Sequence, residues 1–416
     1  MKISQNDRAI LRHLAETVAE IAALPIHQEK VELWRRLNDL EKVRPMIWIN
    51  EIPWHEMNVN DELTLHAENE FCRQIETELR RTIYQWQHLP ADMIIGPKFY
   101  SPFVIRDSGF GIREETDIVR YDENNNIISQ DFHPQIRDER DIEQIANPVV
   151  SLDQEATERN YQILNDLFGD ILSVKKRGII RFWFAPWDQL VMWYGVEEAL
   201  TDLVLRPELV HQAMDRLVSA HLARLDQYVS LNLLSFSEGN FRVGSGGLGY
   251  TKELPKPNFN PHWVRTIDQW GFATAQIFCD VSPGMHEEFA LKYERRWLER
   301  FGLNYYGCCE PLHNKIHLLK SIPNLRKISM SPWIDVEKAV ENVGDNYVFS
   351  YKSNPAIVAT VEWNPELARK NLEEVLEKTK GCHVEVILKD ISTVRYEPQR
   401  LWEWEKMAME LVEEYL

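Results

Sequence analysis

Short β-type runs alternate with long helical patterns along most of this chain. Nine runs have the pattern of strands, at 46–50, 92–96, 179–184, 233–238, 274–279, 304–309, 327–331, 347–351 and 384–388. Long helical patterns occupy 60–86, 196–229 and 365–379, with Pro207 opening a new helix inside the second. Such alternation implies a parallel sheet, and its eight or so repeats favour a (β/α)₈ TIM barrel over an open doubly wound sheet.

The barrel is expected to span residues 45–416, with an N-terminal helical extension over 1–44 packed on its outside. No GxGxxG follows the first strand, which argues against a dinucleotide-binding fold. The stretch 110–150 is polar and is expected to be a surface excursion, a hairpin that turns at Asn124 to Asn126.

Composition excludes several classes of function. The net charge of −18 argues against a nucleic-acid-binding surface, which needs a basic stripe. No apolar run approaches the length of a membrane span, and the polar N-terminus lacks the apolar core of a secretory signal. We therefore expect a cytoplasmic protein without a membrane segment. Its five cysteines are an odd number, so metal binding or plain burial is favoured over a disulfide framework.

Chemically capable groups follow nearly every predicted strand. In a barrel the loops after the strands form the mouth, where catalytic groups gather. Asp188, Glu238 and Asn240 are the candidate catalytic residues at these ends. Candidate cofactor- or ligand-binding residues are Trp187, Tyr100, Trp333 and Lys352. Each of the aromatic residues could equally serve only to pack the core.

The stretch NYYGCCEPLHNK (304–315) concentrates ligand-type side chains. Pro311 suits the first turn of a helix, which would place Cys309 and Glu310 beside a helix N-terminus and lower the pKa of a thiol there. His313 lies four residues from Cys309. A catalytic zinc needs three protein ligands, so another strand end would have to contribute one. Buried structural thiols remain the alternative. Cys308, one residue earlier on a strand, should face away from Cys309.

A glycine-rich loop, GSGGLG (244–249), follows the fourth predicted strand. A Walker A loop needs Gly-Lys-[Ser/Thr] after its spacing, and this loop has none. The interpretation that we adopt is a mobile or tightly turned lid over the barrel mouth, with a plain surface turn as the alternative.

Several segments, in order, resemble the uroporphyrinogen decarboxylase superfamily over about residues 40 to 410. Arg44–Trp48 lies where the family's first strand begins, and Ala185–Leu190 with 199–215 resembles its "GPFT" strand end and the helix pair after it. Residues 276–278 with 282–289 are similar to its "LSPEMFEEF" segment, and Gly307–Glu310 falls where the family carries His-x-Cys-Gly. Residues 327–335 with 351–356 match the order "S-x-D … GNLDP". The resemblance implies a (β/α)₈ barrel.

Departures from the family pattern favour one branch of it. True decarboxylases carry "RQAGRY" after the first strand, with arginines for porphyrin carboxylates, whereas this chain has Ile49–Trp54 there, without arginine. The sequence is more similar to the corrinoid-dependent (methylcobamide) methyltransferases. In that branch a zinc held by His-x-Cys and a distant cysteine activates a thiol. Cys309 matches the family's cysteine, but Gly307 replaces its histidine.

The resemblance therefore implies zinc with a rebuilt ligand set: Cys309 and Glu310, completed by Glu238, His313 or Asp390. It also implies methyl transfer to or from a small acceptor, a corrinoid-binding protein as partner, and a monomer or homodimer. Trp187, Tyr100 and Trp333 would line a cavity for a flat corrin edge or a methylammonium group.

Two other classes of function stay open. One is a decarboxylase or lyase of a small carboxylic acid, in which Lys98, Arg242 or Lys352 binds the carboxylate and Asp188 or Glu238 transfers the proton. The other is a non-catalytic barrel that binds a corrinoid protein.

Overall fold

A six-stranded, fully parallel sheet organises the molecule. The computed structural model describes residues 3–119 and 129–415. The sheet order is β1-β12-β11-β10-β9-β8, with the bounds β1 (Met46–Ile49), β12 (His383–Leu388), β11 (Val348–Ser353), β10 (Leu325–Met330), β9 (Leu303–Tyr306) and β8 (Trp270–Ala273). β12 pairs with β1 on one side and with β11 on the other, and both pairings are parallel.

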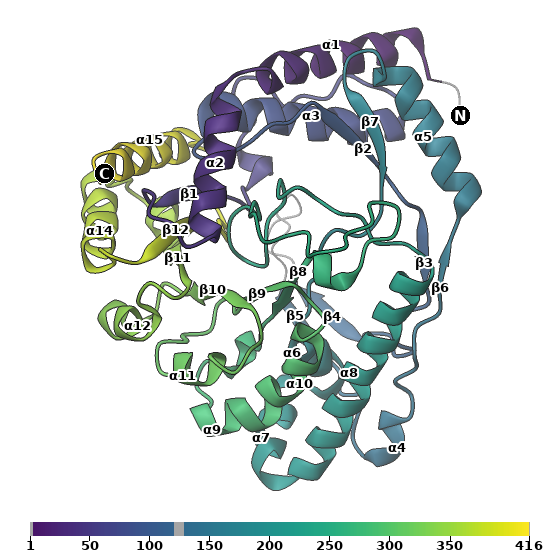
Figure 1. Ribbon diagram of the computed structural model, residues 1–416, viewed down its shortest axis with the longest axis vertical. Coiled ribbons are helices and arrows are strands. Elements are labelled where there is room, and N and C mark those ends of the chain that lie inside the picture. The colour runs from purple at the N-terminus through teal and green to yellow at the C-terminus, as the bar shows by residue number, and fades with distance from the viewer. Residues whose placement is uncertain (1–2, 120–128, 416) are drawn as a thin grey trace.

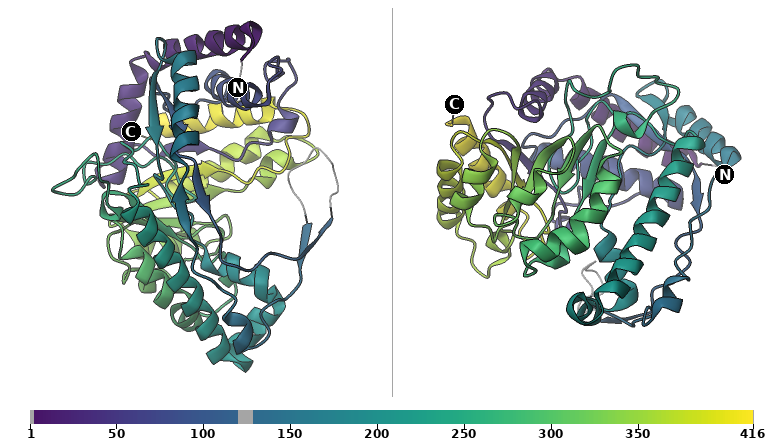
Figure 2. Two further views of the ribbon diagram at one scale, coloured as in Figure 1. Left: turned by 90° about the vertical axis from the view of Figure 1, so that its right-hand side faces the viewer. Right: turned by 60° about the horizontal axis from the view of Figure 1, so that its bottom comes forward.

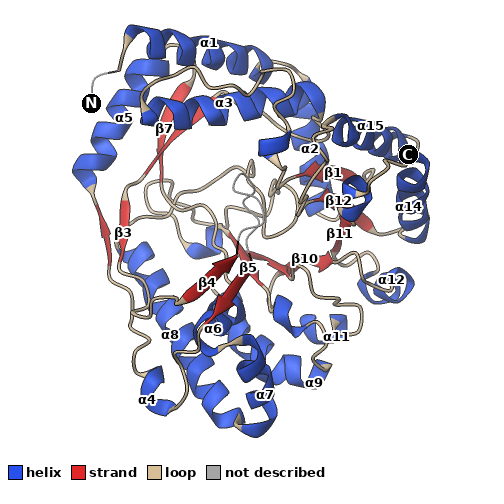
Figure 3. Ribbon diagram, turned by 180° about the vertical axis from the view of Figure 1, so that it is seen from behind, coloured by secondary structure: helices blue, strands red, loops and turns tan. Residues whose placement is uncertain are grey.

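These strands are buried because both of their faces are covered. Every residue of β8, β9 and β12 is buried, as expected for parallel strands between helices and a filled interior. In Figures 1 and 3 the strands form an arc with helices on its outer side. The C-terminal helices of that layer are α11 (Ile316–Leu319), α12 (Val336–Val343), α13 (Ala356–Ala359), α14 (Pro365–Lys378) and α15 (Gln399–Glu413).

The arc is barrel-like but not a hydrogen-bonded closed barrel. Single backbone hydrogen bonds extend it on each side, from Asp92 N–H to Ile47 O (3.2 Å) and from Thr274 N–H to Phe184 O (3.3 Å). Within residues 3–119 and 129–415 no strand ladder joins 92–96 to 179–184. The closed (β/α)₈ barrel therefore remains a prediction, and the parallel sheet with its helices is confirmed.

Four of the predicted strands differ from the structure. Residues 92–96 are extended without a ladder, and 179–184 and 233–238 share only the isolated bridge between Ile179 and Leu234. The strand predicted at 274–279 lies earlier, as β8. β2 (Lys98–Pro102) and β7 (Ser173–Arg177) instead pair with each other outside the arc. The gap has a physical reason: the Asn240 side chain donates to the carbonyl of Ile94 (3.2 Å), where a neighbouring strand would otherwise bind.

The glycine-rich loop fills the interior of the arc, so the prediction of a mobile lid is wrong. Ser245 is fully buried, and Gly247 N–H donates to the Glu385 carboxylate on β12 (3.2 Å). A Cβ at Gly247 would lie 2.2 Å from the Trp34 ring, and one at Gly246 would lie 2.3 Å from the Glu385 carboxylate. Glycine is needed here because the loop backbone packs directly against other side chains.

Two helices, α1 (Gln5–Ala22) and α2 (Ile26–Asn38), occupy the predicted N-terminal extension. α1 packs beside α3 (Glu70–His88) and α5 (Gln154–Phe168), and α2 contacts β1. Ser4 caps α1 by accepting from Asp7 N–H, and Asn69 caps α3. That cap explains why α3 begins at Glu70, ten residues after the start of the predicted helical stretch at 60.

The polar stretch at 110–150 contains an antiparallel strand pair (Figure 2). β4 (Thr116–Val119) pairs antiparallel with β5 (Ser129–Phe132), and β3 (Ile105–Asp107) with β6 (Val150–Leu152). The turn predicted at Asn124 to Asn126 lies outside the described residues. The remaining helices are α4 (Glu139–Ile142), α6 (Pro186–Tyr194), α7 (Val196–Leu205), α8 (Pro207–Ser230), α9 (Pro283–His286) and α10 (Lys292–Leu298). Pro207 opens α8, as predicted.

Candidate functional site

The two adjacent cysteines lie at the carboxyl end of β9 with their sulfurs together. Cys308 Sγ and Cys309 Sγ are 3.5 Å apart. The prediction that Cys308 faces away from Cys309 is therefore wrong. The alternation of a strand ends at Tyr306, because Gly307 takes a φ of +96° and turns the chain. Cys308 is 4% exposed, and Cys309 is exposed at the surface.

The Cys309 thiol is favoured as a thiolate by its neighbours. Its pKa is lowered first by the hydrogen bond with Cys308 and also by the positive charge of Lys389. The same hydrogen bond and burial raise the pKa of Cys308. The predicted helix N-terminus plays no part, since the helix after this stretch, α11, begins only at Ile316.

Glu310 holds the turn that carries the cysteines. Its fully buried carboxylate accepts from Thr274 Oγ1 (2.9 and 3.1 Å), Ala275 N–H (3.3 Å) and Cys308 N–H (2.8 Å). Because both oxygens are used by donors from β8's carboxyl end and from the cysteine turn, Glu310 ties these two strand ends together.

A cationic side chain beside the cysteines comes from the end of β12. Lys389 is 5% exposed, pairs with Asp390, and lies 3.5 Å from the Glu51 carboxylate. Arg242 Nη1 also donates to Glu51 (2.6 Å). Although burial opposes it, these cations and the hydrogen bond with Asp390 lower the pKa of Glu51 to about 2. Burial and Glu51 raise the pKa of Asp390.

Asp188 lies at the same edge, at the start of α6. Its side chain accepts a hydrogen bond from Gln276, the residue next to Ala275. The pKa of Asp188 is raised to about 6, chiefly by burial; the Gln276 hydrogen bond opposes this shift, and the nearby charge of Glu310 contributes to it. A carboxyl group with such a pKa can exchange a proton near neutral pH.

Lys352 is buried inside the arc, away from the surface. Its Nζ donates to Tyr305 Oη (2.7 Å), Ser350 Oγ (2.9 Å) and Ser350 O (3.0 Å). Burial lowers the pKa of Lys352 to about 7. Below it in the interior, Lys327 and Glu385 form a pair at 2.7 Å with no exposure of either side chain. All three donor positions of Lys352 are therefore occupied within the protein.

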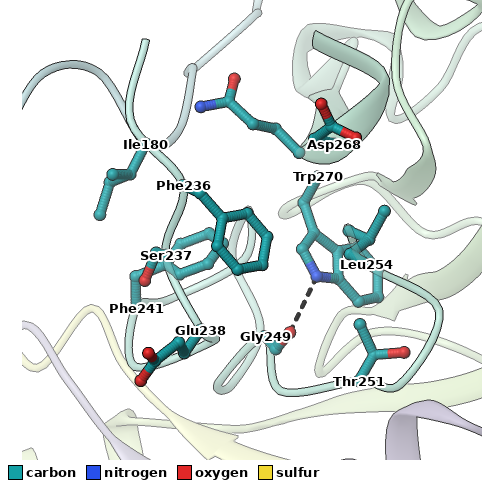
Figure 4. Close-up of a pocket in the computed structure, with 11 residues that line it drawn as sticks. Ile180, Phe236, Ser237, Glu238, Phe241, Gly249, Thr251, Leu254, Asp268 and Trp270 are labelled. Atoms are coloured by element: carbon teal, nitrogen blue, oxygen red, sulfur yellow. Dashed lines mark hydrogen bonds between the residues drawn. The ribbon is translucent and has the colours of Figure 1, made fainter. Parts of the chain in front are cut away.

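Three predicted residues gather elsewhere, around a cavity of about 330 Å³ near α2. Tyr100, Glu238 and Asn240 line it together with Lys98, whose Nζ lies 3.2 Å from the Glu238 carboxylate. Glu238 also borders a second cavity, shown in Figure 4, where Trp270 Nε1 donates to Gly249 O (2.9 Å). That second cavity has a volume of about 10 Å³, enough for one water molecule at most.

The remaining predicted residues are Trp187, Trp333 and His313. Trp187 is fully buried, donates from Nε1 to Phe289 O (3.0 Å) and fills the core instead of lining a cavity. Trp333 is 69% exposed. His313 Nε2 contacts the side-chain amide of Asn314 (3.0 Å). Burial lowers the pKa of His313; the charge of Asp335 opposes this shift, and the charge of Lys338 adds to it.

The donor arrangement does not fit the predicted zinc. Within the described parts of the chain, no three or more His, Cys, Asp or Glu side chains are grouped to hold a metal ion. Glu310 is turned inward to three donors, and Asp390 pairs with Lys389. Cys308 and Cys309 lie side by side, with sulfurs 3.5 Å apart. We therefore derive no chemical step through zinc.

Sequence reasoning missed Lys389, Gln276 and the joint role of the two cysteines. Lys389 follows directly on the last buried strand, so the rule on strand ends points to it as much as to Asp390. Gln276 gave no such signal, because the strand that precedes it was predicted four residues too late.

The fold is similar to that of a solved structure. No protein-family model matches the chain, and no curated protein matches it. The structure is similar to that of a methyltransferase from Methanosarcina mazei, with 12% sequence identity and a TM-score of 0.53, over 93% of this chain and 98% of that chain. In residues 3–119 and 129–415, no helix is long and apolar enough to cross a membrane. What this chain shares with that methyltransferase is its barrel-like α/β fold over nearly its full length.

Proposed function

We propose that this protein is a methyltransferase in which the Cys309 thiolate receives a methyl group at the carboxyl edge of the sheet. The observation that carries the proposal is the Cys309 thiol itself: it is exposed, at a strand end, and has a lowered pKa. The similarity of fold to a methyltransferase supports the same class of reaction.

In the proposed step, the lone pair of Cys309 Sγ attacks the methyl carbon of the donor. A sulfur–carbon bond forms, and the electron pair of the broken bond leaves with the donor. Cys308 stabilises the thiolate through its S–H, and Lys389 adds a positive charge. Lowering a thiol's pKa increases the fraction present as the nucleophilic thiolate at neutral pH.

A corrinoid-binding protein remains the partner that we propose as the methyl donor, in a cytoplasmic setting. The resemblance to methylcobamide methyltransferases suggested it. If such a partner docks, the exposed Cys309 must lie within its reach, and the neighbouring Asp390 and Glu51 would lie at the contact.

Free methylcobalamin can replace the unidentified donor protein in a direct test. After incubation, peptide mass spectrometry is expected to find one added methyl group on Cys309. The Cys309→Ser variant should lose this methylation and at least 100-fold of any methyl-transfer rate, since removing a nucleophile removes the covalent route. Cys279→Ser is the matched control, because Cys279 is also an exposed free thiol. Equal rates in wild type and Cys309→Ser would overturn the proposal.

A second candidate function is supported by Asp188. A half-buried carboxyl with a pKa of about 6 suits proton transfer in a decarboxylase or lyase of a small acid. In that case Asp188→Asn would abolish CO₂ release from a small carboxylic acid while Cys309→Ser would retain it. The opposite pattern favours methyl transfer.

A further inference from the structure

We propose that Cys308 and Cys309 form a reversible disulfide between adjacent residues when a hydroperoxide oxidises the protein. This inference concerns the same turn but is independent of methyl transfer. Its geometric basis is the 3.5 Å separation of the two sulfurs, which point to the same side of the chain after Gly307. A contraction of about 1.5 Å brings them to the bond length of a disulfide.

The two thiols differ in the way that a peroxide-reactive pair requires. Cys309 is exposed and can meet an oxidant from solution, whereas Cys308 is 4% exposed and meets only its neighbour. Lys389 lies nearby and favours the anionic sulfur. Accessible thiolates with a neighbouring thiol are the usual sites of reversible oxidation.

The reaction balances with one hydroperoxide per pair. The Cys309 thiolate attacks one peroxide oxygen, the O–O bond breaks, and a sulfenic acid and hydroxide (or alkoxide) result. Cys308 sulfur then attacks the sulfur of the sulfenic acid, and the S–O bond breaks. The thiol proton and solvent protons convert the leaving oxygens to water or alcohol. The two sulfurs have together lost two electrons, and the peroxide has gained them.

The oxidised pair should also be easy to reduce. Adjacent residues across a trans peptide have Cα atoms about 3.8 Å apart, shorter than the roughly 4.4–6.8 Å usual for disulfides, and such deviations store strain. A small dithiol can therefore attack one sulfur and restore both thiols. The exposed edge at Cys309 gives it access.

Intact-mass and peptide mass spectrometry test the proposal on the full chain. One equivalent of hydrogen peroxide is expected to remove two hydrogen atoms from the peptide that holds both cysteines, and dithiothreitol should restore them. Cys309→Ser and Cys308→Ala should each abolish this loss. The Cys279→Ser variant should still lose two hydrogen atoms on oxidation, which would also exclude a disulfide that includes Cys279.

Two results would overturn the inference. One is stable oxygen addition at Cys309 in the wild type, to the same extent as in Cys308→Ala. The other is a disulfide that includes Cys279. Cys309→Ser changes an exposed side chain and is therefore expected to fold. It still tests the inference if the Cys308→Ala variant does not fold. Because the readout is mass, failure of methyl transfer leaves the result unaffected, and failure of the disulfide leaves the methylation of Cys309 untouched.

Discussion

The interior of the arc and its carboxyl edge both contain charged groups from β12, but they differ in how those groups are satisfied. In the interior, Glu385 has its partner Lys327 at 2.7 Å, and neither is exposed. At the edge, the buried Lys389 pairs with Asp390, whose side chain is exposed, near an exposed thiol. β12 thus contributes one member, Glu385, of a closed ion pair with Lys327 of β10, whereas the charged residues that directly follow β12 lie at an open edge. Chemistry is expected only where a ligand can still bind.

The largest effect should come from breaking the interior pair. Lys327→Met leaves the Glu385 carboxylate buried without its cation, which should cost about 3–5 kcal/mol of unfolding free energy in urea titrations. The double variant Lys327→Met/Glu385→Leu should recover much of that loss, since no charge is left buried. A loss below about 1 kcal/mol in the single variant would mean that the interior is not closed to water.

A substitution of Asp188 tests whether burial disfavours the ionised form of this carboxyl group at the edge of the sheet. Its pKa is raised from 3.8 to about 6, so the folded protein keeps a proton between these values that the unfolded chain loses. The contribution of Asp188 to the free energy of unfolding of the wild type therefore falls as pH rises from 4 to 6. Asp188→Asn, which does not titrate, should gain up to about 3 kcal/mol relative to wild type between pH 4 and pH 7.

Urea unfolding of both proteins at the two pH values measures this difference. Asp280→Asn serves as control, because Asp280 is an exposed aspartate at the same edge. A difference between wild type and Asp188→Asn that does not vary with pH would show that Asp188 is solvated like any surface carboxylate.

The smallest change in the free energy of unfolding is expected from a substitution at the cavity near α2. Lys98 and Glu238 pair at 3.2 Å, but their side chains are 38% and 75% exposed. Glu238→Gln should change the unfolding free energy by less than about 1 kcal/mol, and high salt should remove the difference. Methylation of Cys309 should continue unchanged in this variant. A large loss of activity would move the catalytic site from the cysteines to this cavity.

The sequence predicted the regular parts of the fold well and the irregular parts poorly. β10, β11 and β12 follow from short β-type runs, and α8 and α14 follow from helical patterns with helix-starting prolines at 207 and 365. The segments 92–96 and 179–184 have the same kind of pattern, yet they lack ladders. The Asn240 side chain donates to the Ile94 carbonyl in the first, and the second has only the isolated bridge of Ile179 with Leu234. No local pattern in a glycine-rich loop reveals that it will enter the interior.

Part of the candidate site could also be predicted from the sequence. Cys309, Glu310 and Asp390 were found because strand ends meet at one edge of a parallel sheet. The contact between Cys308 and Cys309 was missed, because it depends on the positive φ of Gly307, which cancels the alternation of a strand. Glu238 and Asn240 follow a segment that never joins the ladder, so they lie at another cavity.

The inserted glycine-rich loop has a consequence for how the chain folds. Asn38 binds the Leu248 carbonyl across 210 residues of sequence, and Gly247 binds Glu385 across 138. Contacts between such distant segments require large loops to close first, and proteins rich in them fold slowly. We therefore expect the interior to be among the last regions to form, because it needs segments from the beginning, the middle and the end of the chain at once.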